Sequence, residues 1–383
     1  MPWEQTCAMD EKIKFITSVK SGIYSFAEVC RQFGISRKSG YRLLERYESE
    51  GEKALVVRSR APHSHPNALD EQVGAQLLAI KQRYPHFGPR KVRDYARLAG
   101  WDAGLPAVST IGELFKRYGL VHPRKRRRRT PGQVGAGLRN AVQPNGLWCV
   151  DFKGQFRLGN ARYCYPLTLS DQASRYLLVC RGLYEPTERA VRPYFEWAFH
   201  EYGLPWALRS DNGTPFASIA LGGLSRLAVW WLKLGIALER IAPGHPEQNG
   251  RHERMHRTLK AHIGPGARHL AAQQHSLDAF REHYNVERPH ESLGGLPPVR
   301  CYAPSLRPYP ARVREPEYAD EVQVRRVRSN GQIKWGGQMV YVSDVLIGEA
   351  VGLTALEEDR WQIQFCDLLL GVFNQRSGKI EAL

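Results

Sequence analysis

Three acidic residues occur at positions where a carboxylate could take part in catalysis. Asp151 interrupts the apolar run WCVDF, Asp211 follows the short run PWALRS, and Glu253 lies in the polar segment HPEQNGRHERMHRTLK. Cleavage or transfer of a phosphodiester needs a strong nucleophile and neutralised phosphate oxygens, which two Mg²⁺ ions roughly 4 Å apart can supply. Hard divalent ions prefer oxygen ligands, so several Asp or Glu side chains must converge. The three carboxylates are therefore candidates for a metal-dependent phosphoryl-transfer site.

Each carboxylate also has a structural interpretation. Asp151 could face water from an edge strand, and Asp211 could be a turn residue in an Asp-Asn-Gly sequence. Glu253 could form a surface ion pair with Arg257, four residues later on a helix. The signals of Asp211 and Glu253 are weak individually, and it is the combination of three acids that favours a site.

The elements around these residues indicate an α/β ribonuclease H-like core. Three strand-like runs, GLWCVDFKGQF, ARYCYPLTLSD and SRYLLVCRGL, are followed by the predicted helix TERAVRPYFEWAFHEYG. The strand PWALRS, the helix GGLSRLAVWWLKLG, the strand IALERIAP and a helix beginning near Pro246 complete the pattern. In such a sheet the first and fourth strands are neighbours, so the three carboxylates can converge.

The blocks VDFKG, LRSDNGTPF and HPEQNGRHERMHRTLK resemble those of the DDE integrase core, which retroviral integrases share with many insertion-sequence transposases. The whole chain resembles the insertion-sequence 481 family, and HYNVERPHESLGGLPPVR is similar to a further block common in these transposases. The resemblance implies that Asp151, Asp211 and Glu253 are catalytic and bind two Mg²⁺ ions, with Mn²⁺ as a substitute. The 41 residues between Asp211 and Glu253 exceed the usual gap, and we expect the extra length around ASIALGGLS.

The resemblance also implies a reaction. Water would cut an element end to free a 3′-OH, which would then attack target DNA. Arg257 and Lys260 would hold DNA near the metals, while Asn212 and Asn249 would support the carboxylates. A nuclease that never joins DNA and a DNA-binding regulator without catalysis are the alternatives. Because two ends must be joined together, a dimer or tetramer is expected.

Other acidic residues near these blocks are expected to be structural. Asp171 falls in a predicted hairpin turn, and Glu239 lies beside Arg240 in a strand and is expected to be a paired surface charge. Glu247 follows Pro246 at the predicted helix entrance, where a carboxylate complements the helix dipole.

Three histidines near Glu253 raise the question of a metal trio. They are His245, His252 and His256. His252 and His256 are one helical turn apart, whereas His245 precedes the predicted helix. No Cys or other fourth ligand is near, so zinc is not expected.

The charge of the chain predicts a polyanionic partner, double-stranded DNA, comprising inverted-repeat ends and target. The net charge is +17, and residues 1–150 carry 26 Lys and Arg against 13 Asp and Glu. Residues 1–60 are predicted to form a helix-turn-helix domain, with Ser25 and Ser36 as helix caps and Glu28 completing a capping box. Its candidate DNA contacts are Arg37, Lys38, Tyr41 and Arg42.

The remaining domains are predicted from composition and periodicity. Residues 66–122 indicate a second helix-turn-helix or winged-helix unit, with Ser109 as a cap. Its candidate DNA contacts are Arg90, Lys91 and Arg93. A basic linker at 123–143, a core at 144–298 and a small C-terminal β-barrel at 299–383 follow. The linker residues expected to contact phosphates are Arg124, Lys125, Arg126, Arg127, Arg128 and Arg129.

The location of the protein is predicted from two further features. Seven widely spaced cysteines without a CxxC motif are typical of reduced thiols rather than a disulfide framework. The most apolar stretch, LAVWWLKLGIAL, is too short to span a membrane. We therefore expect a cytoplasmic, nucleoid-associated bacterial protein.

Overall fold

The computed structural model describes residues 7–56, 68–101, 104–121, 138–242, 245–357 and 359–382. It separates into two compact units, residues 1–68 and 69–383. The predicted phosphate-contacting block 124–129 lies outside the described residues. No helix in the described part of the chain is long and apolar enough to cross a membrane.

The first unit is helical, as predicted. It contains α1 (Ala8–Ser21), α2 (Phe26–Gln32), α3 (Arg37–Glu50) and a 3₁₀ turn (Gly51–Leu55). The side chains of Ser25 and Ser36 accept amide hydrogens at the starts of α2 and α3, which confirms both caps. The reciprocal capping box forms at Cys7 and Asp10, at the start of α1, rather than at Ser25 and Glu28.

A second group of helices opens the larger unit. It consists of α4 (Glu71–Arg83), α5 (Pro89–Leu98) and α6 (Val108–Arg117), packed around a core that includes Leu77, Phe87 and Ile111. The prediction that Ser109 caps α6 is wrong. Ala107 holds the cap position, so Ser109 lies within the first turn of the helix.

The central sheet has the strand order expected for an integrase-like core. Its strands are β1 (Trp148–Phe152), β2 (Phe156–Arg157), β3 (Tyr163–Asp171), β4 (Leu177–Leu183), β5 (Ala207–Ser210) and β6 (Ala237–Arg240). The order is β2-β3-β1-β5-β6, with β4 also paired to β3. The β1–β5 and β5–β6 pairs are parallel and the others antiparallel, so β1 is an interior strand.

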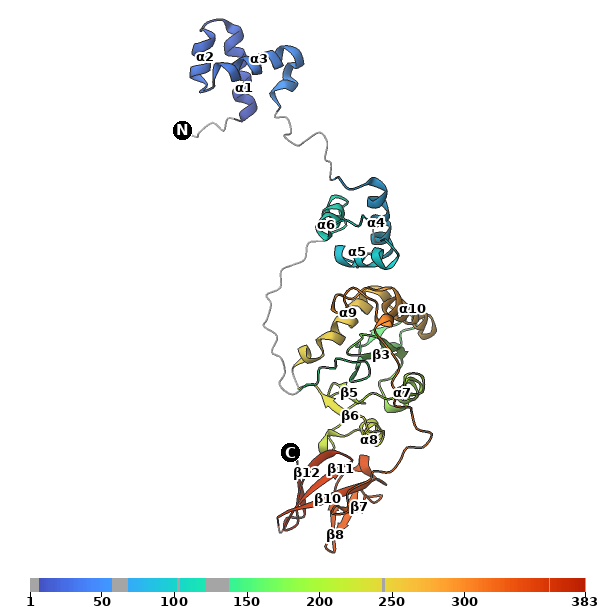
Figure 1. The fold of residues 1–383 in the computed structure, drawn as a ribbon. Coiled ribbons are helices and arrows are strands. Elements are labelled where there is room, and N and C mark those ends of the chain that lie inside the picture. Colours follow the sequence, from blue (N-terminus) through green and yellow to red (C-terminus); the bar gives the residue numbers. More distant parts are fainter. Residues whose placement is uncertain are drawn as a thin grey trace. The chain divides into compact units, whose positions relative to one another are not determined.

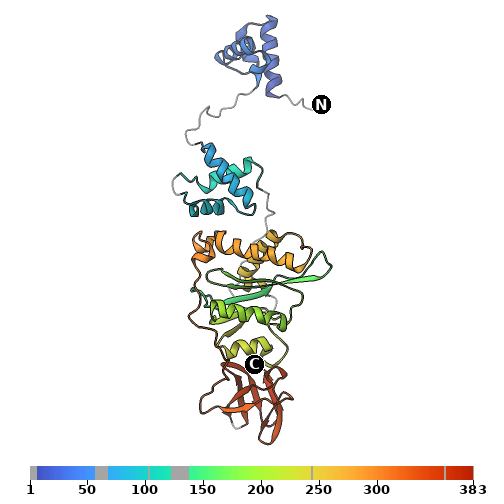
Figure 2. The ribbon, with the colours of Figure 1, turned by 90° about the vertical axis from the view of Figure 1, so that its right-hand side faces the viewer.

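Helices cover both faces of this sheet (Figures 1 and 2). On one face α7 (Glu188–Tyr202) and α8 (Arg226–Lys233) bury a core that includes Trp148, Val150 and Phe199. On the other face α9 (Gly250–Ile263) and α10 (Leu270–Glu282) enclose a core that includes Cys180 and Leu259. A π-helical turn (His283–Glu287) and short 3₁₀ turns (Glu291–Leu293, Pro298–Arg300) follow α10.

The C-terminal region is β-structured, but the predicted closed barrel is wrong. Its strands are β7 (Gln323–Arg326), β8 (Gln332–Trp335), β9 (Gln338–Tyr341), β10 (Ala350–Glu357), β11 (Arg360–Phe365), β12 (Leu368–Asn374) and β13 (Lys379–Ala382). One open sheet has the order β13-β12-β11-β10-β7, and β8–β9 is a separate ribbon. The edge strands β7 and β13 each pair with one neighbour and not with each other, so the sheet does not close.

The extra residues between Asp211 and Glu253 contact this C-terminal region. A 3₁₀ turn (Leu221–Gly223) precedes Leu224, which packs with Val229 of α8 into the core of the C-terminal sheet. An ion pair of 2.8 Å between Lys233 Nζ and Glu349 Oε2 joins the same two regions. The added length therefore supports an interdomain contact.

Candidate active site

Asp151 and Asp211 lie at the same ends of adjacent parallel strands. Cys149 of β1 pairs with Arg209 of β5, and the two aspartates each follow two residues after that pair. Asp151 itself pairs with Thr168 of β3. The edge-strand interpretation of Asp151 is therefore wrong, because β1 has a neighbour on both sides.

The turn interpretation of Asp211 is compatible with a site role. One of its carboxylate oxygens, Oδ1, accepts the amide hydrogen of Gly213 at 3.1 Å, as in a local turn. The Asn212 side chain donates to the carbonyl oxygen of Ile241 at 2.8 Å. This bond ties the loop after β5 to the chain that leaves β6, and it fixes the segment that carries Asp211.

Glu253 lies in the first turn of α9, closer to the helix start than predicted. Residues Pro246–Asn249 form a 3₁₀ turn, and the α-helix begins only at Gly250. The buried Asn249 holds the cap position. Glu253 is exposed, and the later Arg257 and Lys260 are exposed on the same stripe of the helix.

The pKa of Asp151 responds to the other two carboxylates. Burial and the negative charges of Asp211 and Glu253 raise the pKa of Asp151 to about 7, against the Phe152 amide and Lys153, which lower it. Within the described residues, no Lys or Arg forms an ion pair with any of the three acids. Neighbouring carboxylates without cationic partners are a chemical fit for a divalent cation.

Two other acidic residues near the site have structural partners. The carboxylate of Asp171 accepts the amide hydrogens of Asn145 at 2.8 Å and Ser174 at 2.7 Å, as expected of a residue that shapes a turn. Glu239 is paired, but the prediction of a surface charge is wrong. Its Oε2 atom lies 2.9 Å from Arg209 Nη2, and both side chains are largely buried between neighbouring strands.

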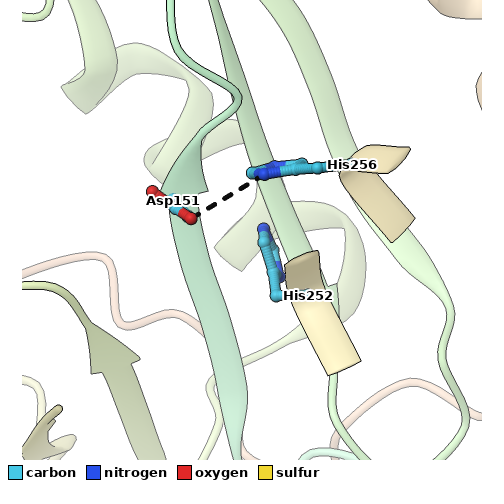
Figure 3. A group of neighbouring side chains, drawn as sticks. All are labelled: Asp151, His252 and His256. Atoms are coloured by element: carbon cyan, nitrogen blue, oxygen red, sulfur yellow. Dashed lines mark ion pairs between the residues drawn. The ribbon is translucent and has the colours of Figure 1, made fainter. Parts of the chain in front are cut away.

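Two histidines of α9 complete the polar cluster next to Asp151 (Figure 3). The Nε2 atoms of His252 and His256 each lie 2.7 Å from the hydroxyl of Thr168. That hydroxyl donates its one proton to the carbonyl oxygen of Asp151 at 2.9 Å. Both Nε2 atoms must therefore donate, which leaves each Nδ1 atom with a lone pair.

The two lone pairs have different surroundings. His252 Nδ1 lies 3.0 Å from the Ser170 hydroxyl, which can donate to it. His256 Nδ1 lies 3.8 Å from Asp151 Oδ2. Burial lowers the pKa of His252, and it lowers the pKa of His256 to about 3, so both rings are neutral at neutral pH. His256 Nδ1 and Asp151 Oδ2 thus face each other as two acceptors.

Such a pair can share a cation. The ligand atoms of Asp151, His252 and His256 all lie within 4.8 Å of one another, close enough to hold a metal ion. Zinc was not expected at the three histidines, whereas the structure places His252 and His256 beside Asp151. The sequence signal was their spacing of four residues on one helix face, with His256 three residues after Glu253.

Lys153 is a further residue near the site that was not predicted. Burial lowers the pKa of Lys153, the positive charge of Lys260 lowers it further, and Asp151 opposes both. Lys153 and Lys260 therefore lie on the same side of the site as Asp151. The signal in the sequence was the alternation of Asp and Lys in VDFKG, since residues two apart on a strand share a face.

The candidate DNA contacts of the helical groups differ in their availability. On α3 the four side chains are exposed: Arg37, Lys38, Tyr41 and Arg42. On α5, Arg90 forms an ion pair with Glu291, and Arg93 Nε donates to the carbonyl oxygen of Pro106 at 3.1 Å. Lys91 is partly buried and forms no ion pair within the described residues.

Comparison with known families assigns the central region. Residues 141–246 and 234–298 match two families that are both described as "Integrase core domain". Residues 141–298 form an integrase core domain. Residues 11–63 match a "Helix-turn-helix domain" and residues 39–115 a "Homeodomain-like domain". The narrower assignment to the insertion-sequence 481 family stays a prediction.

Individual proteins similar to this integrase-core chain come from insertion elements. "Insertion element IS476 uncharacterized 39.2 kDa protein" of Xanthomonas euvesicatoria is 28% identical, over 70% of this chain and 76% of that protein. "Insertion element IS407 uncharacterized 31.7 kDa protein" of Burkholderia multivorans is 27% identical, over 61% of this chain and 81% of that protein. Among solved structures, the HTLV-2 integrase catalytic core domain is 14% identical with a TM-score of 0.34, over 43% of this chain and 100% of that one.

Proposed function

We propose that this protein is a transposase. It binds the ends of an insertion element, cuts DNA to free 3′-OH groups and joins those groups to target DNA by transesterification. The integrase core domain, the helix-turn-helix domains and the relatives named as insertion-element proteins all support this function. The strong net positive charge of +17 suits a DNA substrate.

The observation that carries the proposal is the position of Asp151 and Asp211 at the same ends of adjacent parallel strands, and the raised pKa of Asp151, caused by burial and by the charges of Asp211 and Glu253, supports it. The three acids are contributed by the ends of two adjacent strands and by the first turn of α9. We assign them as catalytic residues that hold divalent ions, two Mg²⁺ with Mn²⁺ as a substitute. Bound ions would activate the attacking hydroxyl and neutralise the reacting phosphate.

The surrounding side chains position the reactants. Lys153, Arg257 and Lys260 can hold phosphates of the DNA backbone beside the acids. Asn212 fixes the loop after β5 through the Ile241 carbonyl, and thereby the position of Asp211. The cap residue Asn249 precedes the helix turn that carries Glu253. No covalent protein–DNA intermediate is needed.

A strand-transfer assay tests this function. The substrates are oligonucleotides carrying the inverted repeats that flank the gene, either intact or pre-cut to expose a 3′-OH. Glu253→Gln is expected to abolish cleavage and joining while it leaves end binding largely intact. Glu247→Gln is the matched control, because Glu247 lies in the 3₁₀ turn before α9 and is expected to affect stability at most.

The same assay separates the competing functions. Hydrolysis of the ends without joining, even from a pre-cut 3′-OH, would identify a nuclease and contradict the transposase proposal. If Asp151→Asn left every DNA-dependent effect of the protein unchanged, the protein would be a regulator that binds DNA without catalysis. Joining that is lost in Asp151→Asn, Asp211→Asn and Glu253→Gln supports the proposal.

DNA recognition and assembly complete the proposed function. The exposed α3 residues are assigned to contacts with the inverted repeats, and the second helical group and the basic linker to further backbone contacts. Joining two ends in one event requires at least two copies of the protein, so we assign a dimer or tetramer as the active form. Light scattering of the protein bound to end DNA measures that number directly.

A further inference from the structure

Five basic side chains gather beside the candidate active site. They come from the turn between β3 and β4, from the first turns of α9, from the segment after the π-helical turn, and from α5. The residues are Arg175, Arg251, Arg254, Arg288 and Lys91. Within the described residues none of them forms an ion pair. This grouping is called the basic cluster below.

The members of the basic cluster act on one another electrostatically. Burial lowers the pKa of Arg175, and the positive charges of Arg251 and Arg254 lower it further. Burial and the positive charges of Arg288 and Arg254 lower the pKa of Lys91 to about 7, against the opposing charges of Glu291 and Asp94. Contacts between the segments agree with this: the Asn285 side chain accepts from the Leu177 amide at 2.8 Å and donates to the Leu177 carbonyl oxygen at 3.0 Å, which joins the end of the β3–β4 turn to the segment before Arg288.

Direct contacts fix the position of Arg288 in this region. Its Nη2 atom lies 3.4 Å from the hydroxyl of Thr258 on α9, and its guanidinium lies 5.7 Å from the centre of the Phe87 ring. Thr258 in turn donates to the carbonyl oxygen of Arg254, one turn earlier on the same helix. The ring of His290, two residues after Arg288, is centred 4.9 Å from the ring of Tyr284.

Three buried nitrogen atoms at this place have no hydrogen-bond partner within the described part of the chain. They are Arg175 Nη1, Arg288 Nε and His290 Nε2. Buried polar atoms in folded proteins are nearly always paired, so each exception calls for a ligand or another explanation. Guanidinium groups have only donors, and a neutral imidazole can donate from Nε2, so a ligand that satisfies all three must supply acceptors, and the surrounding positive charges favour an anion.

The position of the basic cluster relates it to the candidate active site. Arg251 and Arg254 lie within two residues of Glu253 in the first turns of α9, and Arg288 contacts Thr258 of the same helix. A DNA strand that reaches the carboxylates therefore passes within reach of the cluster.

We propose that Arg175, Arg288 and His290 bind one backbone phosphate of the DNA, with the other members of the basic cluster around it. The proposal rests on the proposed function, because it takes DNA as the ligand. It gives a role to Arg288 and His290 of the segment HYNVERPH, which have no part in the proposed three-carboxylate site. Arginine forks match the geometry of phosphate oxygens, and a phosphate supplies the acceptors that the buried donors lack.

The experiment scans single methylphosphonate groups, which carry no charge, along the end DNA. Binding is measured with the full-length protein without metal, so that catalysis does not contribute. A methylphosphonate at one position of the DNA is expected to weaken binding by the wild-type protein about tenfold. The same methylphosphonate is expected to cause no further loss of affinity in Arg288→Gln. The slope of log affinity against log salt should fall by about 1 in that variant.

Two further variants keep the test decisive. Arg254→Gln removes an exposed member of the cluster and should show the same loss without disturbing buried packing. Arg189→Gln changes an exposed arginine of α7, on the opposite face of the sheet, and should retain the full methylphosphonate effect. Without DNA, Arg254→Gln is expected to keep or raise the melting temperature, because it removes repulsion, whereas a structural role would lower it.

Each remaining outcome has one meaning. If each methylphosphonate lowers the DNA affinity of Arg288→Gln and Arg254→Gln by the same factor as that of wild type, the proposed phosphate site is wrong, even when strand transfer occurs. If wild type binds no end DNA, the proposed function fails. In that case the melting temperature is measured with inorganic phosphate. If phosphate raises the melting temperature of wild type but not that of Arg288→Gln, the site binds free phosphate and DNA is not its ligand.

Discussion

The environment of a single residue, Asp151, decides the chemistry of the candidate site. Its pKa of about 7 results from burial and from two neighbouring carboxylates, not from any property of aspartate. Thr168 holds the two histidines in one tautomer and so leaves His256 Nδ1 facing Asp151. The site can therefore exchange a proton for a cation.

The raised pKa of Asp151 predicts a pH-dependent effect of metal. The folded state binds this proton more tightly than the unfolded state, whose pKa is 3.8. The resulting stabilisation of the metal-free protein is fully present below about pH 4 and is lost as the pH rises through about 7. Saturating Mg²⁺ should therefore raise the melting temperature more at pH 8 than at pH 6. Thermal unfolding measures both shifts, and Asp151→Asn should remove the difference.

Thr168→Val is predicted to weaken metal binding without unfolding the core. Valine has a similar shape but cannot hold the Nε2 atoms of His252 and His256. Loss of an outer contact of this kind typically costs about 10- to 100-fold in metal affinity. Calorimetric titration with Mn²⁺ measures the change. Ser170→Ala, which affects His252 alone, should have a smaller effect, and equal effects would contradict the role given to His256.

Among the helices and strands, local sequence sets which elements form, while packing sets where they end. The caps at Ser25 and Ser36 follow from their side chains. The start of α9 at Gly250 and the start of α6 at Val108 do not follow from the nearest Pro or Ser, because neighbouring segments fix them. The open C-terminal sheet likewise depends on which strands meet.

Two helical glycines give opposite predictions. A methyl group at Gly40 of α3 would lie 2.8 Å from Cys30 Sγ and 3.0 Å from the rings of Phe15 and Phe26. Gly40→Ala should therefore destabilise the first unit by about 1–3 kcal/mol, as overpacking usually does. At Gly112 of α6 the nearest atom is 3.6 Å away, so Gly112→Ala should stabilise by about 0.5–1 kcal/mol. Denaturant unfolding measures both, and a stabilised Gly40→Ala would contradict this packing.

Over the whole chain, the division into two units places the proposed end-recognition helix and the proposed catalytic acids in different units. Residues 1–68 and 69–383 are compact by themselves. The exposed basic helix α3 belongs to the first unit, and all three carboxylates belong to the second. The two proposed roles can therefore be removed independently.

Deletion of residues 1–68 is predicted to leave the metal response intact and to remove end specificity. The larger unit keeps its own core, so its melting temperature should still rise with Mg²⁺. Preference for end DNA over unrelated DNA should fall by about 10³-fold or more, which is the usual advantage of specific contacts. Competition binding measures that ratio. Retained preference in the truncated protein would place recognition in the second helical group instead.

Residue types and their periodicity were enough to single out the three acids as candidates, to find the capped helices and to predict the class of the core. They were enough because residue type and periodicity depend directly on local structure and burial. They did not predict that the C-terminal sheet stays open or that α9 starts at Gly250. They also missed the roles of His256, Lys153 and Arg288. These features depend on contacts between segments far apart in the sequence, and the folded chain alone brings α9, the β3–β4 turn and the segment after α10 to one place.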